Sequence, residues 1–328
     1  MTYPFGMHLS YQFDPITQAL DTIVDPDSGQ VWLADVQMSE FSTAQTLVLG
    51  NGVTRSNTFD WAGRATRMAT RLNDTYLSNL YYTFDWNSNI THIQEQIGEM
   101  PHGDMYYAYD PLDRLTLAWG TTMSGSDAGN EIIPGYNYHY DSLGRMTSNS
   151  RFANPTYGDY TLEYEYSANP QSDRPTHGLR GIRFTKATEP SVYAHKFQYD
   201  AAGNLIHSSN ETAVIFENDL ERNFTWDALG RLTSLTNTGG TTSFAYDHAK
   251  NRVSKTGPDG QTVVYIGDMI EVTADGLTQH IFAGPIRIGT VKPSGEKLFY
   301  MTDHLRSSTL ISDEAGNLVQ RTDCTRFD

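Results

Sequence analysis

Short segments in which apolar and polar residues alternate recur along the chain, separated by turn-forming residues. Examples are residues 136–140 and 160–166, which are rich in Tyr. A period of two with many Tyr, Thr and Val side chains is typical of β-strands. Helical periodicity is weak: residues 41–49 could form a short helix, but Gly50-Asn51-Gly52 after them favours a strand and a turn. We therefore predict an almost entirely β protein.

A longer pattern is superimposed on these strands. An aromatic residue and Asp are followed by two variable residues, usually Gly, then Arg or Asn and an aliphatic residue. The aromatic residues at 59, 84 and 109 are 25 positions apart. Such self-similarity indicates a repeat architecture in which each unit packs on its neighbours. The residues that define the pattern most clearly are Phe59, Asp60, Gly63, Tyr140, Asp141, Gly144, Tyr199, Asp200, Gly203, Trp226, Asp227, Gly230, Tyr246 and Asp247.

Each copy predicts a β-hairpin. The Asp suits the first position of a turn, because its carboxylate can accept a backbone N–H two residues later. The Gly suits a left-handed conformation after a type I turn, which is the usual three-residue connection that ends in a bulge. Ser88, Asp113 and Lys250 replace this Gly in three copies. We expect those turns to be strained or to adopt another geometry.

The repeated Asp residues could be interpreted as carboxylate pairs for acid–base catalysis. We favour turn capping, because Asp commonly hydrogen-bonds its own backbone in turns. Asp303-His304 is an adjacent acid–imidazole pair in a recognisable motif, and we expect a structural hydrogen bond there. The aromatic rings could stack on sugars, but cross-strand packing explains one ring per repeat more simply. We predict no catalytic residue, cofactor or metal site.

The amino-acid composition limits the classes of binding partner that the chain can have. The chain has 328 residues, with 39 acidic and 23 basic side chains and a net charge of −16. This acidic balance argues against nucleic-acid binding. The single cysteine, Cys324, excludes a disulfide framework, and no apolar stretch is long enough to span a membrane. No signal peptide is visible, and both ends resemble interrupted hairpins, so we expect a piece of a longer protein.

These motifs resemble the RHS/YD-repeat family, whose signature is the aromatic-Asp-x-x-Gly-Arg unit. Residues 246–266 are similar to the start of the RHS repeat-associated core, and residues 300–310 resemble the family's Thr-Asp-His-Leu-Gly-Ser block. In that block Asp303, His304 and Leu305 match, and Arg306 replaces the usual Gly. The resemblance covers residues 11–328. We assign residues 1–256 to a hairpin array and 257–328 to a C-terminally truncated core segment.

The resemblance implies a β-sheet that spirals into a hollow shell. In bacterial members the shell encloses a toxic polypeptide encoded after the core, and related shells occur in toxin complexes and in teneurin adhesion proteins. It therefore implies a secreted or cell-surface bacterial shell fragment, with a polypeptide cargo and a capping or delivery subunit as partners.

Two alternatives remain. One is an adhesion module that binds surface glycans. The other is a self-cleaving protein, because many bacterial members cut themselves at an aspartyl-protease-like site downstream of the residues present here.

Overall fold

The computed structural model consists of strands and turns, with no helix among the residues it describes. These residues are 2–3, 5–97, 100–123, 130–152, 158–166, 178–186, 189–210 and 221–322, so Cys324 lies outside them. The all-β prediction is confirmed. Residues 44–49, where a helix was the alternative, form a strand.

The described strands are β1 Ser10–Phe13, β2 Leu20–Val24, β3 Val31–Met38, β4 Ala44–Leu49, β5 Val53–Phe59, β6 Ala65–Leu72, β7 Thr75–Phe84, β8 Ile90–Ile97, β9 Met100–Tyr109, β10 Leu115–Met123, β11 Asn130–Tyr140, β12 Met146–Phe152, β13 Tyr160–Tyr166, β14 Leu179–Lys186, β15 Glu189–Tyr199, β16 Leu205–Asn210, β17 Glu221–Trp226, β18 Leu232–Asn237, β19 Gly240–Tyr246, β20 Arg252–Thr256, β21 Thr262–Ile266, β22 Ile270–Thr273, β23 Gly276–Ala283, β24 Ile286–Val291, β25 Lys297–Thr302, β26 Ser308–Ser312 and β27 Leu318–Arg321.

Neighbouring strands pair antiparallel as hairpins. Between β5 and β6 the register runs from Val53 opposite Leu72 to Thr58 opposite Arg67, and it shifts by one residue before Phe59. A shift at this place is the bulge that the turn sequence predicts, because one extra residue is needed where the connection closes. The same shift precedes Tyr140, Tyr199, Trp226 and Tyr246.

Packing divides the chain into two compact units. Unit 1 combines Met1–Tyr106, Thr121–Glu131 and Tyr265–Asp328, and unit 2 combines Tyr107–Gly120 with Ile132–Val264. The C-terminal strands therefore pack with the first strands of the chain. The sequence boundary at residues 256 and 257 stays a prediction, because it is based on the repeat pattern and not on packing.

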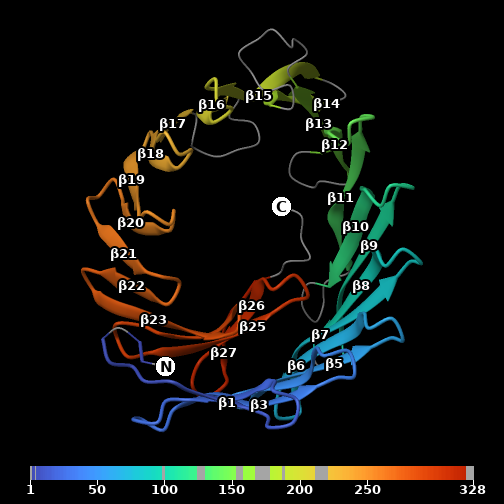
Figure 1. The fold of residues 1–328 in the computed structure, drawn as a ribbon. Coiled ribbons are helices and arrows are strands. Elements are labelled where there is room, and N and C mark those ends of the chain that lie inside the picture. The colour runs from blue at the N-terminus through green and yellow to red at the C-terminus, as the bar shows by residue number, and fades with distance from the viewer. Residues whose placement is uncertain are drawn as a thin grey trace. The chain divides into compact units, whose positions relative to one another are not determined.

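Unit 1 contains the main hydrophobic core, which forms where the C-terminal strands β22–β27 lie against the N-terminal strands (Figure 1). Trp32 on β3 is only 1% exposed, and its ring centre is 5.0 Å from that of Phe299 on β25. Gly289 on β24 makes this contact possible, because a Cβ there would lie 2.4 Å from Trp32 Cε3. The buried residues of this core are Tyr3, Leu9, Ile23, Trp32, Leu33, Leu49, Val53, Ile270, Ile281, Ile288, Phe299, Met301 and Leu310.

Unit 2 has smaller apolar clusters. One contains Ala118, Tyr136 and Tyr138, and the other contains Tyr160 and Phe184 with Ala194. Strands β17–β21 of this unit contain no fully buried side chain. Backbone hydrogen bonds between the strands, and contacts between the turns, must therefore supply much of what holds these strands together.

Candidate functional site: the repeated turn and the C-terminal block

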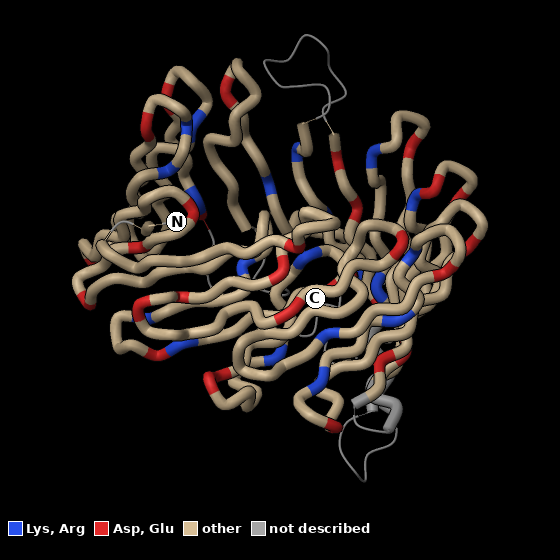
Figure 2. Tube along the Cα trace, turned by 60° about the horizontal axis from the view of Figure 1, so that its bottom comes forward, with Lys and Arg blue, Asp and Glu red and all other residues tan. Residues whose placement is uncertain are grey.

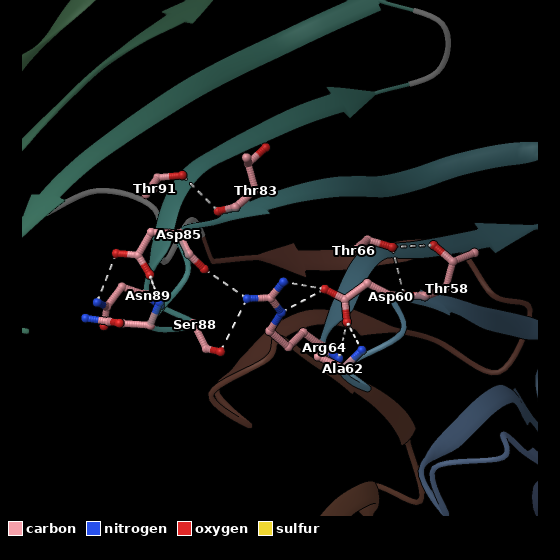
Figure 3. Close-up of polar contacts among 11 residues, drawn as sticks. Thr58, Asp60, Ala62, Arg64, Thr66, Thr83, Asp85, Ser88, Asn89 and Thr91 are labelled. Carbon is pink, nitrogen blue, oxygen red and sulfur yellow. Dashed lines mark hydrogen bonds and ion pairs between the residues drawn. The ribbon is translucent and has the colours of Figure 1, made fainter.

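The aromatic-Asp turn is held together by its own carboxylate (Figure 3). Asp60 Oδ1 accepts the backbone N–H groups of Ala62 and Arg64, each at 3.0 Å, while Oδ2 accepts Arg64 Nε at 2.7 Å. The Gly63 N–H donates to the Asp60 carbonyl, and the φ of Gly63 is 76°. Both turn predictions, the Asp cap and the left-handed Gly, are confirmed for this copy.

Arg64 also reaches the next turn along the sheet. Its Nη1 donates to the Asp85 carbonyl at 3.0 Å and to Ser88 Oγ at 3.3 Å (Figure 3). Its guanidinium lies 4.8 Å from the ring centre of Phe84. The arginine therefore closes its own turn and binds the aromatic residue and the backbone of the following one.

The same arrangement recurs in unit 2. Arg114 lies 4.7 Å from the Tyr140 ring centre and donates to the Asp141 carbonyl, and Arg231 lies 5.2 Å from the Tyr246 ring centre and donates to the Asp247 carbonyl. Each such cation–π contact is worth about 0.5–1 kcal/mol at an exposed site. The guanidinium-to-carboxylate pairs within turns are Arg64 with Asp60, Arg114 with Asp110, Arg145 with Asp141, and Arg231 with Asp227.

The aromatic residue links its turn back to the preceding unit. Tyr140 donates its hydroxyl to the Leu115 carbonyl at 2.8 Å, and Trp226 donates Nε1–H to the Leu205 carbonyl at 2.7 Å. The accepting residue occupies the aliphatic position of the preceding repeat. Tyr166 makes the same bond to the carbonyl of Met146. Packing between repeats, rather than sugar stacking, therefore accounts for these rings.

The three turns that lack Gly keep the standard geometry. Ser88, Asp113 and Lys250 have φ values of 72°, 59° and 72°. Their N–H groups donate to Asp85, Asp110 and Asp247, as Gly does elsewhere. Of the two expected outcomes, strain is therefore the correct one, because a Cβ in the left-handed region costs roughly 1–2 kcal/mol.

The turn carboxylates are held in the ionised form. The hydrogen bond from the Arg64 side chain is the largest influence on Asp60 and lowers the pKa of its carboxyl, and backbone N–H groups add to this. A hydrogen bond from Asn204 likewise lowers the pKa of Asp200. A carboxylate with a lowered pKa and donors on both oxygens is poorly suited to accept and release a proton during catalysis.

Figure 2 shows that acidic residues recur at the hairpin turns.

One element of the repeat was missed by sequence reasoning. A Thr stands six positions after the Asp, and its hydroxyl donates to the carbonyl of the residue two positions before that Asp. Thr66 donates to Thr58 at 3.2 Å, and Thr91 donates to Thr83 at 3.2 Å (Figure 3). The signal was present in the sequence, since Thr recurs at positions 66, 91, 116, 147, 233 and 309.

The C-terminal block forms the same turn in a buried setting. Asp303 is 8% exposed, and its Oδ1 accepts the N–H groups of Leu305 and Ser307 at 2.9 and 2.8 Å. Arg306 occupies the Gly position with a φ of 67°. His304 Nδ1 lies 3.1 Å from the Tyr82 hydroxyl on β7, and burial lowers the pKa of His304. Leu305 points to solvent and is 73% exposed.

This block is joined to the N-terminal strands by polar contacts around the core. Desolvation of the half-buried Arg55 guanidinium on β5 lowers its pKa to about 10, and this side chain donates to the Thr302 carbonyl. Asn51 donates to Ser312 Oγ at 2.8 Å and to the Asp313 carbonyl at 2.7 Å. Arg321 pairs with the buried Glu95 on β8. These long-range contacts tie the end of the described chain to β5–β8.

Within the described ranges, no group of three or more His, Cys, Asp or Glu side chains is placed to hold a metal ion. A search of the same residues finds no helix that is long and apolar enough to cross a membrane. The structure therefore brings together turn-forming and packing residues, and the chemistry that they support is structural linkage.

Comparison with known proteins identifies the repeat. The profile of the RHS repeat matches residues 226–262. A comparison with curated proteins finds no match. Among solved structures, the Photorhabdus luminescens Tc holotoxin pore is similar, with a TM-score of 0.65 and 17% identity over 95% of this chain. The crystal structures of TcdB2-TccC3-Cdc42 and of TcdB2-TccC3 without its hypervariable C-terminal region each give a TM-score of 0.69 at 17% identity over 96% of this chain.

This chain spans only a small part of those proteins: 17% of the holotoxin chain and 16% of each of the other two. At such identity the likeness shows a shared fold. Residues 226–262 thus match the RHS repeat, the same turn recurs along the chain, and the fold is that of the Tc toxin structures.

Proposed function

We propose that this chain is a wall segment of an RHS-type shell that encloses a toxic polypeptide encoded after it. The observation that carries the proposal is the role of the repeated turn side chains: the Asp closes the turn, while the Arg and the aromatic residue contact the neighbouring turns. Because these side chains are engaged in structural contacts, they support a wall and are not available as catalytic groups. We infer a non-enzymatic role for residues 1–328.

The C-terminal block has a second role in this proposal. It packs on the N-terminal strands through the Trp32–Phe299 core and through the contacts of Asn51, Arg55 and Glu95. A polypeptide that continues from this block starts from a fixed point on the wall. The cargo would then be held at the shell from its first residues, and self-cleavage, if present, would depend on residues downstream.

The proposed partners are therefore a polypeptide cargo and a subunit that caps or delivers the shell, and the proposed location is secreted or at the bacterial surface. The similar structures support a toxin setting, since they are a Tc holotoxin pore and TcdB2-TccC3 complexes. Nothing in this proposal requires a cofactor, a nucleic acid or a membrane-spanning segment.

Limited proteolysis of the full-length natural protein tests enclosure. We expect the region after residue 328 to resist protease in the intact protein and to be digested rapidly once it is expressed alone. A matched variant, Trp32→Ala, should weaken the core that anchors the C-terminal block and increase digestion of that region. Equal digestion of the downstream region in the intact protein and in isolation would refute the cargo proposal.

A further inference from the structure

The turn between β4 and β5 contains Asn51-Gly52, which is the only Asn-Gly pair in the sequence. Asparagine is among the thermolabile residue types of proteins. A following glycine favours loss of the side-chain amide, because Gly52 has no Cβ to keep its nitrogen away from Asn51 Cγ. The turn is therefore a candidate site of spontaneous covalent modification, and its surroundings decide whether the reaction can occur.

The reaction is the deamidation of Asn51, and water is its only co-reactant. The backbone nitrogen of Gly52 loses its proton to solvent and forms a bond to Asn51 Cγ. The bond between Cγ and the side-chain nitrogen breaks, and this nitrogen takes up a proton and leaves as ammonia. Water then opens the five-membered imide ring: its hydroxyl adds to one of the two carbonyl carbons and its proton returns to the ring nitrogen. The product is aspartate or isoaspartate at position 51.

In the folded chain, hydrogen bonds hold the groups that this reaction needs. Asn51 Nδ2 donates to Ser312 Oγ at 2.8 Å and to the Asp313 carbonyl at 2.7 Å, while Asn51 Oδ1 accepts the Val53 N–H at 3.2 Å. The Gly52 N–H donates to the carbonyl of the last residue of β4 at 2.9 Å. The side-chain amide cannot turn towards the Gly52 nitrogen unless these bonds break, so the folded state opposes the reaction.

The C-terminal block supplies both of the acceptors that hold Asn51 Nδ2. Ser312 ends β26, and Asp313 begins the turn that leads to β27. This turn lies directly on Asn51, because a Cβ at Gly316 would be 3.2 Å from the Asn51 carbonyl oxygen. When the block leaves β4 and β5, Nδ2 loses both acceptors, and the amide is free to turn towards Gly52.

We propose that Asn51 is a deamidation site that the docked C-terminal block protects, so that release of the block from β4 and β5 allows the side chain to react. The modification marks chains in which this contact has opened. It also hinders redocking, because a carboxylate at position 51 has no N–H for the Asp313 carbonyl and places negative charge beside that oxygen. Isoaspartate would in addition lengthen the backbone of a turn in which the φ of Gly52 is 85°. The inference concerns unit 1 alone and does not depend on an enclosed cargo.

Peptide mapping by mass spectrometry, which measures the rate of deamidation at position 51 of the full chain at mildly alkaline pH, tests the proposal. We expect the folded chain to react at least about tenfold more slowly than the same chain in urea, because only molecules with an open contact can react. Ser312→Ala removes one acceptor of Nδ2 and should raise the rate in the folded chain about two- to tenfold. The matched control Ser150→Ala removes a strand hydroxyl that bonds Thr161 in unit 2, and it should leave the rate unchanged.

A second measurement uses the reaction product. Asn51→Asp reproduces the aspartate form, and trypsin should cleave after Arg321 about tenfold faster in this variant than in the wild type, because the block is docked less firmly. The control Asn87→Asp adds the same charge at an exposed position of unit 1 and should leave this cleavage rate unchanged.

Equal rates of deamidation at position 51 in the folded chain and in urea would overturn the proposal. So would the absence of deamidation in urea, or an equal effect of Ser312→Ala and Ser150→Ala. Tryptic cleavage after Arg321 at the same rate in Asn51→Asp and in the wild type would overturn the effect on redocking.

Discussion

Trp32 and Gly289 form a lock between the N-terminal and C-terminal strands of unit 1, and its strength can be measured. Trp32→Ala removes a large side chain that is 1% exposed and is 5.0 Å from Phe299. Truncation of a buried aromatic residue costs about 3–5 kcal/mol of unfolding free energy. We expect the upper half of this range, because the ring packs closely on Phe299 and on the backbone of Gly289. The control Trp86→Ala, at a site 98% exposed, should change stability by less than about 0.5 kcal/mol.

A double-mutant cycle makes this prediction specific. Gly289→Ala alone places a Cβ 2.4 Å from Trp32 Cε3 and should cost about 1–3 kcal/mol through overpacking. In the Trp32→Ala background the clash is gone, so the same substitution should be neutral or slightly stabilising. Urea denaturation followed by far-ultraviolet circular dichroism measures both values. Strictly additive effects of the two substitutions would refute the reasoning, because residues in contact should show a coupling energy.

Three further predictions concern the turns and the ion pair between Arg321 and Glu95. Arg321→Ala should destabilise unit 1 by about 3–5 kcal/mol in urea unfolding, because the buried Glu95 carboxylate loses its cationic partner and keeps only the Ser78 hydroxyl. Glu95→Gln in the same chain should restore part of the loss. Gly144→Ala should lower the melting temperature, because φ is 81° there, whereas Lys250→Gly should raise it, because φ is 72° at Lys250. Each change in unfolding free energy should be about 1 kcal/mol by calorimetry. Shifts of the same sign in the two variants would contradict the turn model. Acid titration should show a loss of stability below about pH 3.8, because the turn carboxylates have pKa values below that ordinary value in the folded protein. The stability that they contribute is complete above pH 3.8 and is lost as the pH falls through their folded-state pKa. A transition centred above about pH 5 would contradict the assignment.

The local structure follows from the sequence because its causes are local. Asp60 and Gly63 are three residues apart, and their roles depend on general properties of the two residue types in turns. The sequence could not decide between strain and a different turn at Lys250, because this balance depends on how firmly the flanking strands hold the turn. The Thr at position 66 was predictable from the repeat but was overlooked.

The long-range structure could not be predicted from the chain alone. Trp32 and Gly289 are a bulky and a small residue 257 positions apart, and nothing in either neighbourhood indicates the other. The pairing of Arg321 with Glu95 is equally remote. The sequence predicted a distinct terminal segment over residues 257–328, but not that residues from 265 onward pack with the first 106 residues. Loop closure over such separations depends on total burial, which no local pattern records.

The arginine contacts couple neighbouring turns of the array mechanically. Arg114 donates to the following turn, and Tyr140 of that turn donates back to Leu115, so neighbouring repeats are coupled in both directions. Where Asn replaces Arg, at positions 89, 204 and 251, the shorter amide closes its own turn by bonding the Asp of that turn. An Arg at position 204 would extend further than Asn towards the turn that contains Gly230, so an Asn204→Arg exchange should stiffen the sheet between these two repeats.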